Sequence, residues 1–311
     1  MAVELKLPKV LEGKTAVVTG SGDGIGRALA IGLAMAGAKV ITNNRSPRPE
    51  GSDAAKVAEE IKQMGGEAIP VFCDVAKFED AEKLIKTAVE AWGRIDILIN
   101  NAGFDRPRMI WNMTEEDWDS LVDCMLKGAF NCSRWACVFM REQRWGRIIM
   151  VSSEAYRGTV GHVNYGAAKA GMVGLARAIA REMGRYGVTC NAICPTAKTK
   201  MTYNPEVIEG MKKRVEKGLM TKEQFEEFMR MPEPEYIIPF VVYLCSDKGA
   251  DINGRVFSVT GGKIALHAEP LDEKTLIKDY EKYGAWTWEE LETLIPRVFG
   301  LKNPFPPEPE K

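Results

Sequence analysis

Residues 15–37 read TAVVTGSGDGIGRALAIGLAMAG, and the order of features within them decides the fold. Thr15–Thr19 is a short apolar run that predicts a buried β-strand. Ile25–Met35 predicts an amphipathic helix, which ends at Gly37. A glycine-rich turn joins the two. The chain therefore begins with a strand, a tight turn and a helix, which is the arrangement that holds a dinucleotide pyrophosphate.

Glycines in this turn let the backbone bend sharply and approach a phosphate group, whose negative charge meets the positive end of the following helix. A glycine pattern alone is also compatible with a merely tight connection, so its place after the first strand supports the interpretation. We expect the following residues of the turn to contact the cofactor: Gly20, Ser21, Asp23, Gly24, Ile25 and Gly26.

Short apolar runs alternate with amphipathic stretches along most of the remaining chain. Further strands are predicted at 39–43, 68–72, 95–99, 147–151, 188–193 and, last in the chain, 256–259. Helices are predicted at 53–64, 78–92 and 163–185, over a region with breaks at about 115–143, and up to residue 245. Continuous apolar strands between helices indicate a parallel sheet covered on both faces. Right-handed crossovers then give a doubly wound, Rossmann-like α/β fold.

The alternation also predicts the domain organisation. We expect one Rossmann-like domain over 1–266 and a partly helical C-terminal extension over 267–311. The segment 196–235 interrupts the alternation after a strand and is interpreted as a helical lid over the ligand crevice. Thr221 and Thr287 are each followed three residues later by Gln or Glu, and this capping-box pattern predicts a helix start at both places.

Composition limits the class of protein. The chain has 311 residues and a formal net charge of −1, so nothing in it favours nucleic acid or an anionic membrane as a partner. No apolar run approaches the length needed to span a membrane. The seven cysteines are scattered and the two histidines lie far from them in sequence. We therefore expect reduced core thiols, no metal site and a cytoplasmic location.

Tyr165 and Lys169, in the stretch YGAAK, are four residues apart in a predicted helix and share one of its faces. A phenol titrates at about pH 10 and needs help to release a proton at neutral pH. The Lys169 ammonium would give this help by favouring the phenolate, and it would also hold a nicotinamide ribose. Ser152 or Ser153, at the end of the preceding strand, would orient a substrate carbonyl. A chance tyrosine and lysine on an ordinary helix is the alternative, and the glycine turn argues against it.

Two other strand ends add to the predicted site. Asp74 and Val75 follow the third strand and would lie near an adenine. Asn101, Ala102 and Gly103 follow the fourth strand and would pack beside the cofactor. Ligands of open α/β sheets bind at the carboxyl ends of the strands, so these residues are expected in one crevice.

The motifs resemble those of the short-chain dehydrogenase/reductase family. The matching pieces are TGSGDGIG, Asp74-Val75, NNAG, the strand-end serines, YGAAK and CPT at 194–196, and they run from about Lys14 to Gly262. The resemblance implies hydride transfer between a substrate carbon and NAD or NADP, with Tyr165, Lys169 and a serine as catalytic residues. It also implies that Pro195 and Thr196 contact the cofactor.

Within that family the chain is most similar to the branch of the 3-hydroxyacyl-CoA dehydrogenase unit of multifunctional β-oxidation enzymes. The stretches that carry this likeness include RYGVTCNAICPTAKTKMT and GRVFSVTGGKIAL. The branch implies a small-molecule substrate, either a 3-hydroxyacyl-CoA or a ring alcohol. It also implies a homodimer or homotetramer, and a hetero-oligomer is left open.

The chain departs from the family pattern in its central helix and its serine. Members usually have an Asn three residues before a glycine in this helix, and the Asn helps to maintain a proton relay. Here the glycine is Gly128, and Met125 stands in the place of the Asn. The family's serine stands thirteen positions before the tyrosine, which selects Ser152. Strand register selects Ser153 instead and implies a one-residue deletion in the loop at 154–164. We favour Ser153 because a buried strand's register is harder to shift than a loop's length.

A third departure bears on the cofactor. Family members specific for NAD usually have an acidic residue at the end of the second strand, where this chain has Asn44 followed by Arg45. Arginine pairs with a 2′-phosphate, and the missing carboxylate removes a repulsion. We therefore favour NADP over NAD, although Asp23 in the glycine turn argues mildly for NAD.

The lid is basic, and its positive side chains could meet the phosphates of a CoA thioester. A solvated helical face is the alternative, because glutamates are interleaved. His162, in the loop before Tyr165, could contact the substrate. The basic lid residues are Lys198, Lys200, Lys212, Lys213, Arg214 and Lys217.

Together the sequence predicts an oxidoreductase that interconverts a secondary alcohol and a ketone. A catalytically silent subunit paired with an active relative is the alternative, motivated by Met125, Asn44 and the shortened serine loop.

Overall fold

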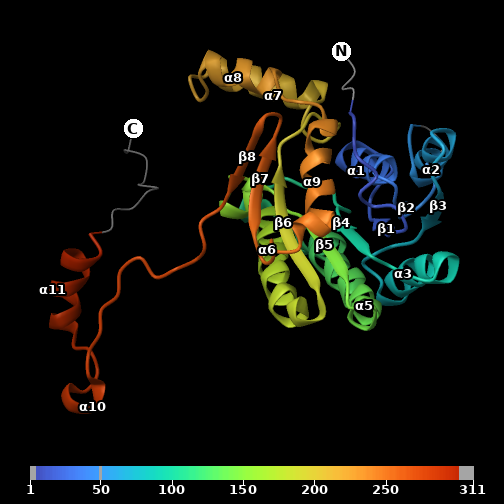
Figure 1. Ribbon diagram of the computed structural model, residues 1–311. Helices are drawn as coiled ribbons and strands as arrows, with labels where there is room; N and C mark the ends of the chain where they lie inside the picture. The colour runs from blue at the N-terminus through green and yellow to red at the C-terminus, as the bar shows by residue number, and fades with distance from the viewer. Residues whose placement is uncertain (1–4, 49–50, 301–311) are drawn as a thin grey trace. The chain divides into compact units, whose positions relative to one another are not determined.

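The computed structural model describes residues 5–48 and 51–300, and its centre is one eight-stranded sheet in the order β3-β2-β1-β4-β5-β6-β7-β8 (Figure 1). The first seven strands in chain order pair in parallel, as the sequence predicts. The strands are β1 Thr15–Val18, β2 Lys39–Asn44, β3 Ala68–Phe72, β4 Ile97–Asn100, β5 Gly146–Val151, β6 Val188–Pro195, β7 Val256–Thr260 and β8 Lys263–Leu266.

The strand β8 corrects the prediction that 256–259 is the last strand. It pairs antiparallel with β7 across a turn formed by Gly261 and Gly262. Its side chains are mostly exposed, so it lacks the buried apolar run used to find the other strands. Two glycines between two short strands are nevertheless a hairpin signal.

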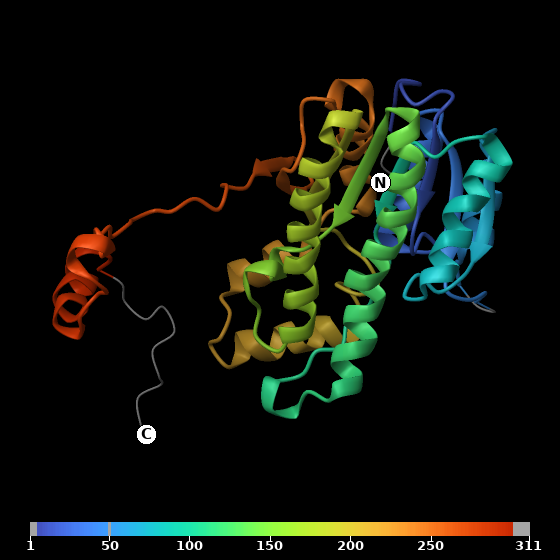
Figure 2. The same ribbon diagram turned by 90° about the horizontal axis from the view of Figure 1, so that it is seen from below.

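Helices cover both faces of the sheet, and each layer encloses a hydrophobic cluster. One cluster joins the sheet to α1, α2 and α9, and the other joins it to α3, α5 and α6. Figure 2 shows α5 and α6 side by side on the second face. The helices of this unit are α1 Gly24–Met35, α2 Ala54–Gln63, α3 Phe78–Trp92, α4 Glu115–Val122, α5 Gly128–Gln143, α6 Val163–Met183, α7 Pro205–Glu216, α8 Lys222–Met229 and α9 Ile238–Cys245.

The predicted breaks in the region 115–143 correspond to one π-helical segment, Asp123–Lys127, which joins α4 directly to α5. Such segments often occur at functional sites because they reorient side chains within a helix.

The predicted lid contains the helices α7 and α8, which lie across one end of the sheet in Figure 1. Thr221 caps α8 with the expected capping box, and Asn204 caps α7, which the sequence analysis did not identify. The lid is therefore a helical insertion between β6 and α9.

The chain divides into two compact units, Met1–His267 and Ala268–Lys311. The second unit contains α10 Tyr280–Tyr283 and α11 Trp288–Val298, and Thr287 caps α11 with a capping box. Inside this unit, Lys278 pairs with Glu290 at 2.7 Å. His267 stays with the first unit because its backbone N–H donates to the Val256 carbonyl oxygen at 2.9 Å.

None of the helices in the described part of the chain is long and apolar enough to cross a membrane.

Candidate active site

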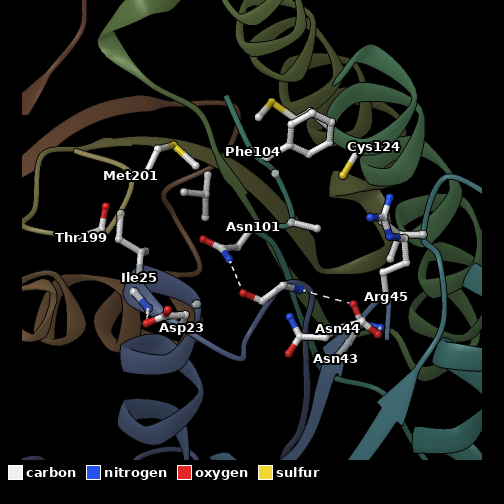
Figure 3. A pocket seen from close by; sticks show the side chains of 18 of the residues that line it. Asp23, Ile25, Asn43, Asn44, Arg45, Asn101, Phe104, Cys124, Thr199 and Met201 are labelled. Atoms are coloured by element: carbon white, nitrogen blue, oxygen red, sulfur yellow. Dashed lines mark hydrogen bonds between the residues drawn. The ribbon is translucent and has the colours of Figure 1, made fainter. Parts of the chain in front are cut away.

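A cavity of about 570 Å³ opens at the carboxyl ends of the parallel strands (Figure 3). Its walls come from the segments that follow β1 to β6 and from the first residues of the lid. The chain order of the strands reverses between β1 and β4, and such a switch point is where open α/β sheets bind ligands.

The glycine turn forms one end of the cavity. Gly20 and Gly24 have φ of +62° and +52°, a conformation that side chains disfavour. A Cβ at Gly20 would also lie 2.7 Å from the Ala102 Cα. The Asn101 amide donates to the carbonyl oxygens of Thr19 and Gly20 at 3.1 Å, which ties the turn to the end of β4 (Figure 3).

Asp23 caps α1 and does not present a free charge to the cavity. Its carboxylate accepts from the Gly24 N–H at 2.8 Å and pairs with Lys200 of the lid at 2.7 Å. The pKa of Asp23 is lowered by these contacts, which outweigh the opposing effect of burial. The pair also links the lid to the glycine turn.

The end of β2 gives the cavity a second polar region. Asn44 is buried, and its Oδ1 has no hydrogen-bond partner within the described ranges. Arg45 and Arg48 line the cavity beside it, and Asp74 and Val75 line it after β3. An unpartnered buried oxygen needs a donor, and a ribose hydroxyl is one. The turn, Asn44 and the two arginines therefore fit an adenine dinucleotide.

Tyr165, Lys169 and Ser153 meet in the cavity wall. The Ser153 side chain lies close enough to the Tyr165 hydroxyl to lower its pKa, and the Lys169 Nζ lies 5.4 Å from the centre of the Tyr165 ring. The buried Lys169 Nζ donates to the Val151 carbonyl oxygen at 2.7 Å. All three residues line the cavity, where the Ser153 and Tyr165 hydroxyls could hold a substrate oxygen.

The expected lowering of the Tyr165 pKa by Lys169 is wrong for the structure described. Burial raises the pKa of Tyr165 to about 12, and the bond to Ser153 opposes this only in part. Burial also lowers the pKa of Lys169 to about 8. Desolvation disfavours both charged forms here, and Lys169 is not among the groups that shift the pKa of Tyr165.

The two candidate serines point in different directions. Ser152 is buried, and its hydroxyl donates to the Lys169 carbonyl oxygen at 2.9 Å. Ser153 is partly exposed, and its side chain is the one that lowers the pKa of Tyr165. Because neighbouring residues at a strand end face opposite sides, only one of them can face the tyrosine.

Met125 lies in the π-helical segment and lines the cavity. It packs on the backbone of Gly103, where a Cβ would lie 2.6 Å from the Met125 Cε. Phe104 and Met201 also line this region (Figure 3). The wall opposite the polar groups is therefore apolar.

Most of the predicted site residues line the cavity, but Ser21 and Thr196 do not. Ser21 is fully buried, and its hydroxyl accepts from the Asn43 N–H at 2.8 Å, so it holds the turn from within. Thr196 is exposed, and its N–H donates to the Val259 carbonyl oxygen. The predicted residues that do line the cavity are Gly20, Asp23, Gly24, Ile25, Gly26, Asn44, Arg45, Asp74, Val75, Asn101, Ala102, Gly103, Ser152, Ser153, Tyr165, Lys169 and Pro195.

His162 does not line the cavity either. Its ring nitrogens contact the Asp105 carboxylate and the Val160 carbonyl oxygen, each at 3.0 Å. Asp105 raises the pKa of His162 through this hydrogen bond. The residue thus contacts the protein instead of the cavity.

The residues predicted to bind the cofactor or to act in catalysis leave out several that line the cavity. Some of these lie close to the strand ends, where adjacency was the available signal. Cys124 and Met125 come from the π-helical segment, and the others come from the lid, whose contribution depends on how it folds back. The residues left out are Asn43, Arg48, Cys73, Phe104, Cys124, Met125, Val151, Ala197, Thr199, Lys200, Met201 and Thr202.

Among the basic lid residues, only Lys200 lines the cavity. Lys198 pairs with Glu233 at 3.6 Å, and Lys213 pairs with Glu209 at 3.8 Å along α7. The remaining three, Lys212, Arg214 and Lys217, are exposed.

Comparison with known proteins adds independent information. The family model described as short chain dehydrogenase matches residues 14–206. Hydroxyacyl-CoA dehydrogenase ChsB1 of Mycobacterium tuberculosis is 36% identical over 304 residues, covering 94% of this chain and 91% of its own. A 3-oxoacyl-[acyl-carrier-protein] reductase of Synechocystis is 37% identical, covering 82% of this chain and 98% of its own.

Longer relatives and solved structures agree with this. Peroxisomal multifunctional enzyme type 2 of Drosophila melanogaster is 39% identical over 82% of this chain, which spans only 40% of that relative's length. The crystal structure of a short chain dehydrogenase from Mycobacterium avium superposes with a TM-score of 0.79 at 38% identity, covering 96% of this chain and 98% of that one.

Proposed function

Because the chain belongs to the short-chain dehydrogenase/reductase family of oxidoreductases, we propose that Tyr165, Ser153 and Lys169 catalyse the interconversion of a secondary alcohol and a ketone. One observation carries the proposal: these three side chains and the glycine turn open into the same cavity. Nothing in the comparisons or the described residues favours the silent-subunit alternative.

The proposed roles follow from the chemistry of each group. A bound nicotinamide supplies or accepts the hydride. Ser153 holds the substrate oxygen, and Tyr165 exchanges a proton with it. The raised pKa of Tyr165 keeps its phenol protonated at neutral pH, ready to donate to a carbonyl oxygen. Lys169, with its ammonium beside the Tyr165 ring, stabilises negative charge that develops on the phenol oxygen.

For the cofactor, the family uses NAD or NADP, and we propose NADP. Arg45 and Arg48 line the cavity beside the neutral Asn44, and a 2′-phosphate binds well to paired arginines. Asp23, the residue that argued for NAD, is paired with Lys200. The remaining predicted contacts, from the glycine turn to Pro195, are proposed as the rest of the cofactor site.

For the substrate, we propose a 3-hydroxyacyl or 3-oxoacyl thioester. The names of two relatives, a hydroxyacyl-CoA dehydrogenase and a 3-oxoacyl carrier-protein reductase, share this chemistry. The apolar wall of Met125, Phe104 and Met201 suits an acyl chain. We propose that CoA phosphates would bind outside the cavity, at the exposed basic face of α7.

We also propose that the protein is cytoplasmic and a homodimer or homotetramer. All seven cysteines are free thiols, which suits a reducing compartment. The division at His267 is proposed as the boundary between the dehydrogenase domain and the extension.

Cofactor binding and turnover test the function together. NADPH and NADH would be titrated by fluorescence, and ketones and 3-oxoacyl-CoA thioesters would then be screened with Tyr165→Phe as control. We expect turnover that falls about 10²- to 10⁴-fold in the variant while cofactor binding persists. Binding without turnover across the panel would instead favour the silent subunit.

A further inference from the structure

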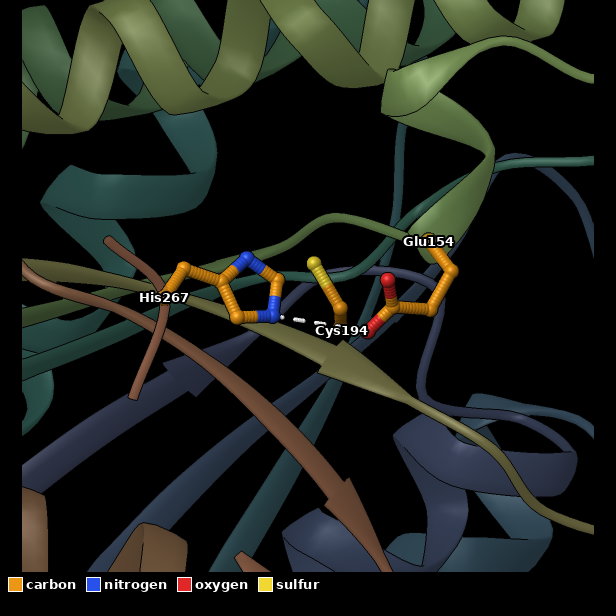
Figure 4. Close-up of side chains that lie close together, drawn as sticks. All are labelled: Glu154, Cys194 and His267. Atoms are coloured by element: carbon orange, nitrogen blue, oxygen red, sulfur yellow. Dashed lines mark ion pairs between the residues drawn. The ribbon is translucent and has the colours of Figure 1, made fainter. Parts of the chain in front are cut away.

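Three side chains with metal-binding atoms converge behind the strand-end serines, outside the cavity. They are Glu154, in the 3₁₀ turn after β5, Cys194 on β6 and His267 after β8 (Figure 4). A carboxylate oxygen, the thiol sulfur and an imidazole nitrogen all lie within 4.8 Å of one another. Cys194 and His267 are buried, whereas Glu154 is partly exposed and gives a path to solvent.

The spacing of these atoms suits a tetrahedral cation. Glu154 Oε1 and His267 Nε2 are 3.4 Å apart. Zinc binds nitrogen and oxygen ligands at about 2.1 Å, and two such ligands at a tetrahedral angle are about 3.4 Å apart. Cys194 would approach by a change in its side-chain position.

The Ser258 hydroxyl, on β7, lies between the first three side chains. It is 2.6 Å from His267 Nε2 and also contacts the Glu154 carboxylate. Two ligands of one tetrahedral ion lie about 3.4 Å apart, so this hydroxyl occupies the place of the ion and must turn away when an ion binds. A water would then complete four-coordination.

The surrounding residues orient these side chains as they do around metal centres. The other ring nitrogen of His267, Nδ1, is 2.8 Å from the Tyr156 hydroxyl, and the two rings stack with centres 5.6 Å apart. Metal-binding histidines usually engage their second nitrogen in this way. Arg157 holds the Glu154 carboxylate at 2.9 Å.

We propose that Glu154, Cys194 and His267 form a binding site for one Zn²⁺ ion, with water as the fourth ligand. The combination of thiolate, imidazole and carboxylate matches the ligand preference of zinc. The carboxylate and thiolate also balance the charge of the ion. The site adjoins the catalytic segment, since Glu154 follows Ser153 and the Cys194 thiol contacts Ser152.

Metal binding to the purified full-length protein tests this site independently of the proposed function. Zn²⁺ would be titrated by calorimetry into the wild-type protein, Cys194→Ser, His267→Ala and Glu154→Gln. His162→Ala is the matched control, because His162 is the only other histidine. We expect one Zn²⁺ per wild-type chain, unchanged affinity in the control, and affinity reduced about tenfold or more in the three site variants.

Co²⁺ gives a second measurement that does not depend on the folding of a variant. Co²⁺ bound by the wild-type protein should show thiolate-to-cobalt charge-transfer absorption, which Zn²⁺ should abolish by displacement. The proposal would be overturned if Zn²⁺ binding does not saturate, if that absorption is absent, or if all variants bind Zn²⁺ equally. The cluster would then be a hydrogen-bonded network only.

Discussion

Lys169 is a charged side chain in an environment that opposes its charge. Its pKa is lowered to about 8 in the folded protein from 10.5. Between these pH values the unfolded chain binds the extra proton, so stability rises with pH. Below about pH 8 the folded protein bears the full cost of the buried charge, about 3 kcal/mol. A residue that costs stability in this way is better explained by function than by packing.

The isosteric variant Lys169→Met measures this cost. Relative to the variant, the wild-type free energy of unfolding should rise by up to about 3 kcal/mol as pH increases from 8 to 10.5. Denaturant titrations across this pH range give the comparison. Parallel pH profiles for the two proteins would show that Lys169 titrates normally in the fold.

Ser153 and Ser152 are neighbours in sequence with different surroundings, so their variants should differ in kind. Ser153→Ala removes the hydroxyl beside Tyr165, and kcat should fall about 100-fold. Ser152→Ala removes a buried bond to the Lys169 carbonyl, and the free energy of unfolding should fall by about 1 kcal/mol. Steady-state kinetics and thermal denaturation of both variants test this. A larger fall in kcat for Ser152→Ala than for Ser153→Ala would assign catalysis to Ser152.

Arg45 and Arg48 should decide the choice of cofactor. Their replacement by alanine removes charge-assisted contacts to a 2′-phosphate, so kcat/KM for NADPH should fall roughly tenfold to hundredfold. The value for NADH should change little, and Arg141→Ala on the exposed side of α5 is the control. A wild-type preference for NAD of more than tenfold would refute the NADP proposal.

At the scale of elements, the glycine turn joins β1 to α1 with almost no free space. A Cβ at Gly26 would lie 2.3 Å from the Gly20 carbonyl oxygen and 2.4 Å from the Asn101 side chain. Gly174 on α6 differs, because it is exposed and a Cβ there meets nothing within 4 Å. A side chain is therefore excluded by lack of space at Gly26 but not at Gly174.

Gly26→Ala should weaken cofactor binding at least tenfold and lower the free energy of unfolding by about 1–3 kcal/mol, since the backbone must shift. Gly174→Ala should raise the free energy of unfolding by about 0.5–1 kcal/mol, because alanine favours the helix. Fluorescence titration and denaturation of the pair test this. Normal cofactor affinity in Gly26→Ala would mean that the backbone of the turn can shift without weakening cofactor binding.

At the scale of the whole molecule, α4 and α5 expose large apolar side chains. Trp118 is 38% exposed and Phe130 is 47% exposed. Exposed apolar side chains of this size can be buried in an interface between subunits. The expected homodimer or homotetramer would use this surface.

Phe130→Asp should therefore shift the protein toward smaller assemblies. Light scattering after gel filtration measures the mass, and Met64→Asp, at the exposed end of α2, is the control. A monomeric wild-type protein, or an unchanged mass in Phe130→Asp, would contradict this use of α4 and α5.

The sequence by itself determined the order of strands and helices, the glycine turn and the spacing of Tyr165 and Lys169. These are local patterns, because apolar runs, glycine turns and helical spacing depend on residues close in the chain. They were enough to predict the doubly wound sheet and most of the cavity. The strand β8 was not predicted from the sequence, because it is mostly exposed and has no buried apolar run.

Only the tertiary structure decided which serine lies beside Tyr165, that burial raises the pKa of Tyr165, and that Lys200 reaches Asp23. It also brought Glu154, Cys194 and His267 together from three distant segments, where the sequence predicted no metal site. The physical reason is common to all of these features. Side-chain direction, desolvation and long-range contacts depend on the packing of segments far apart in sequence, which no local pattern records.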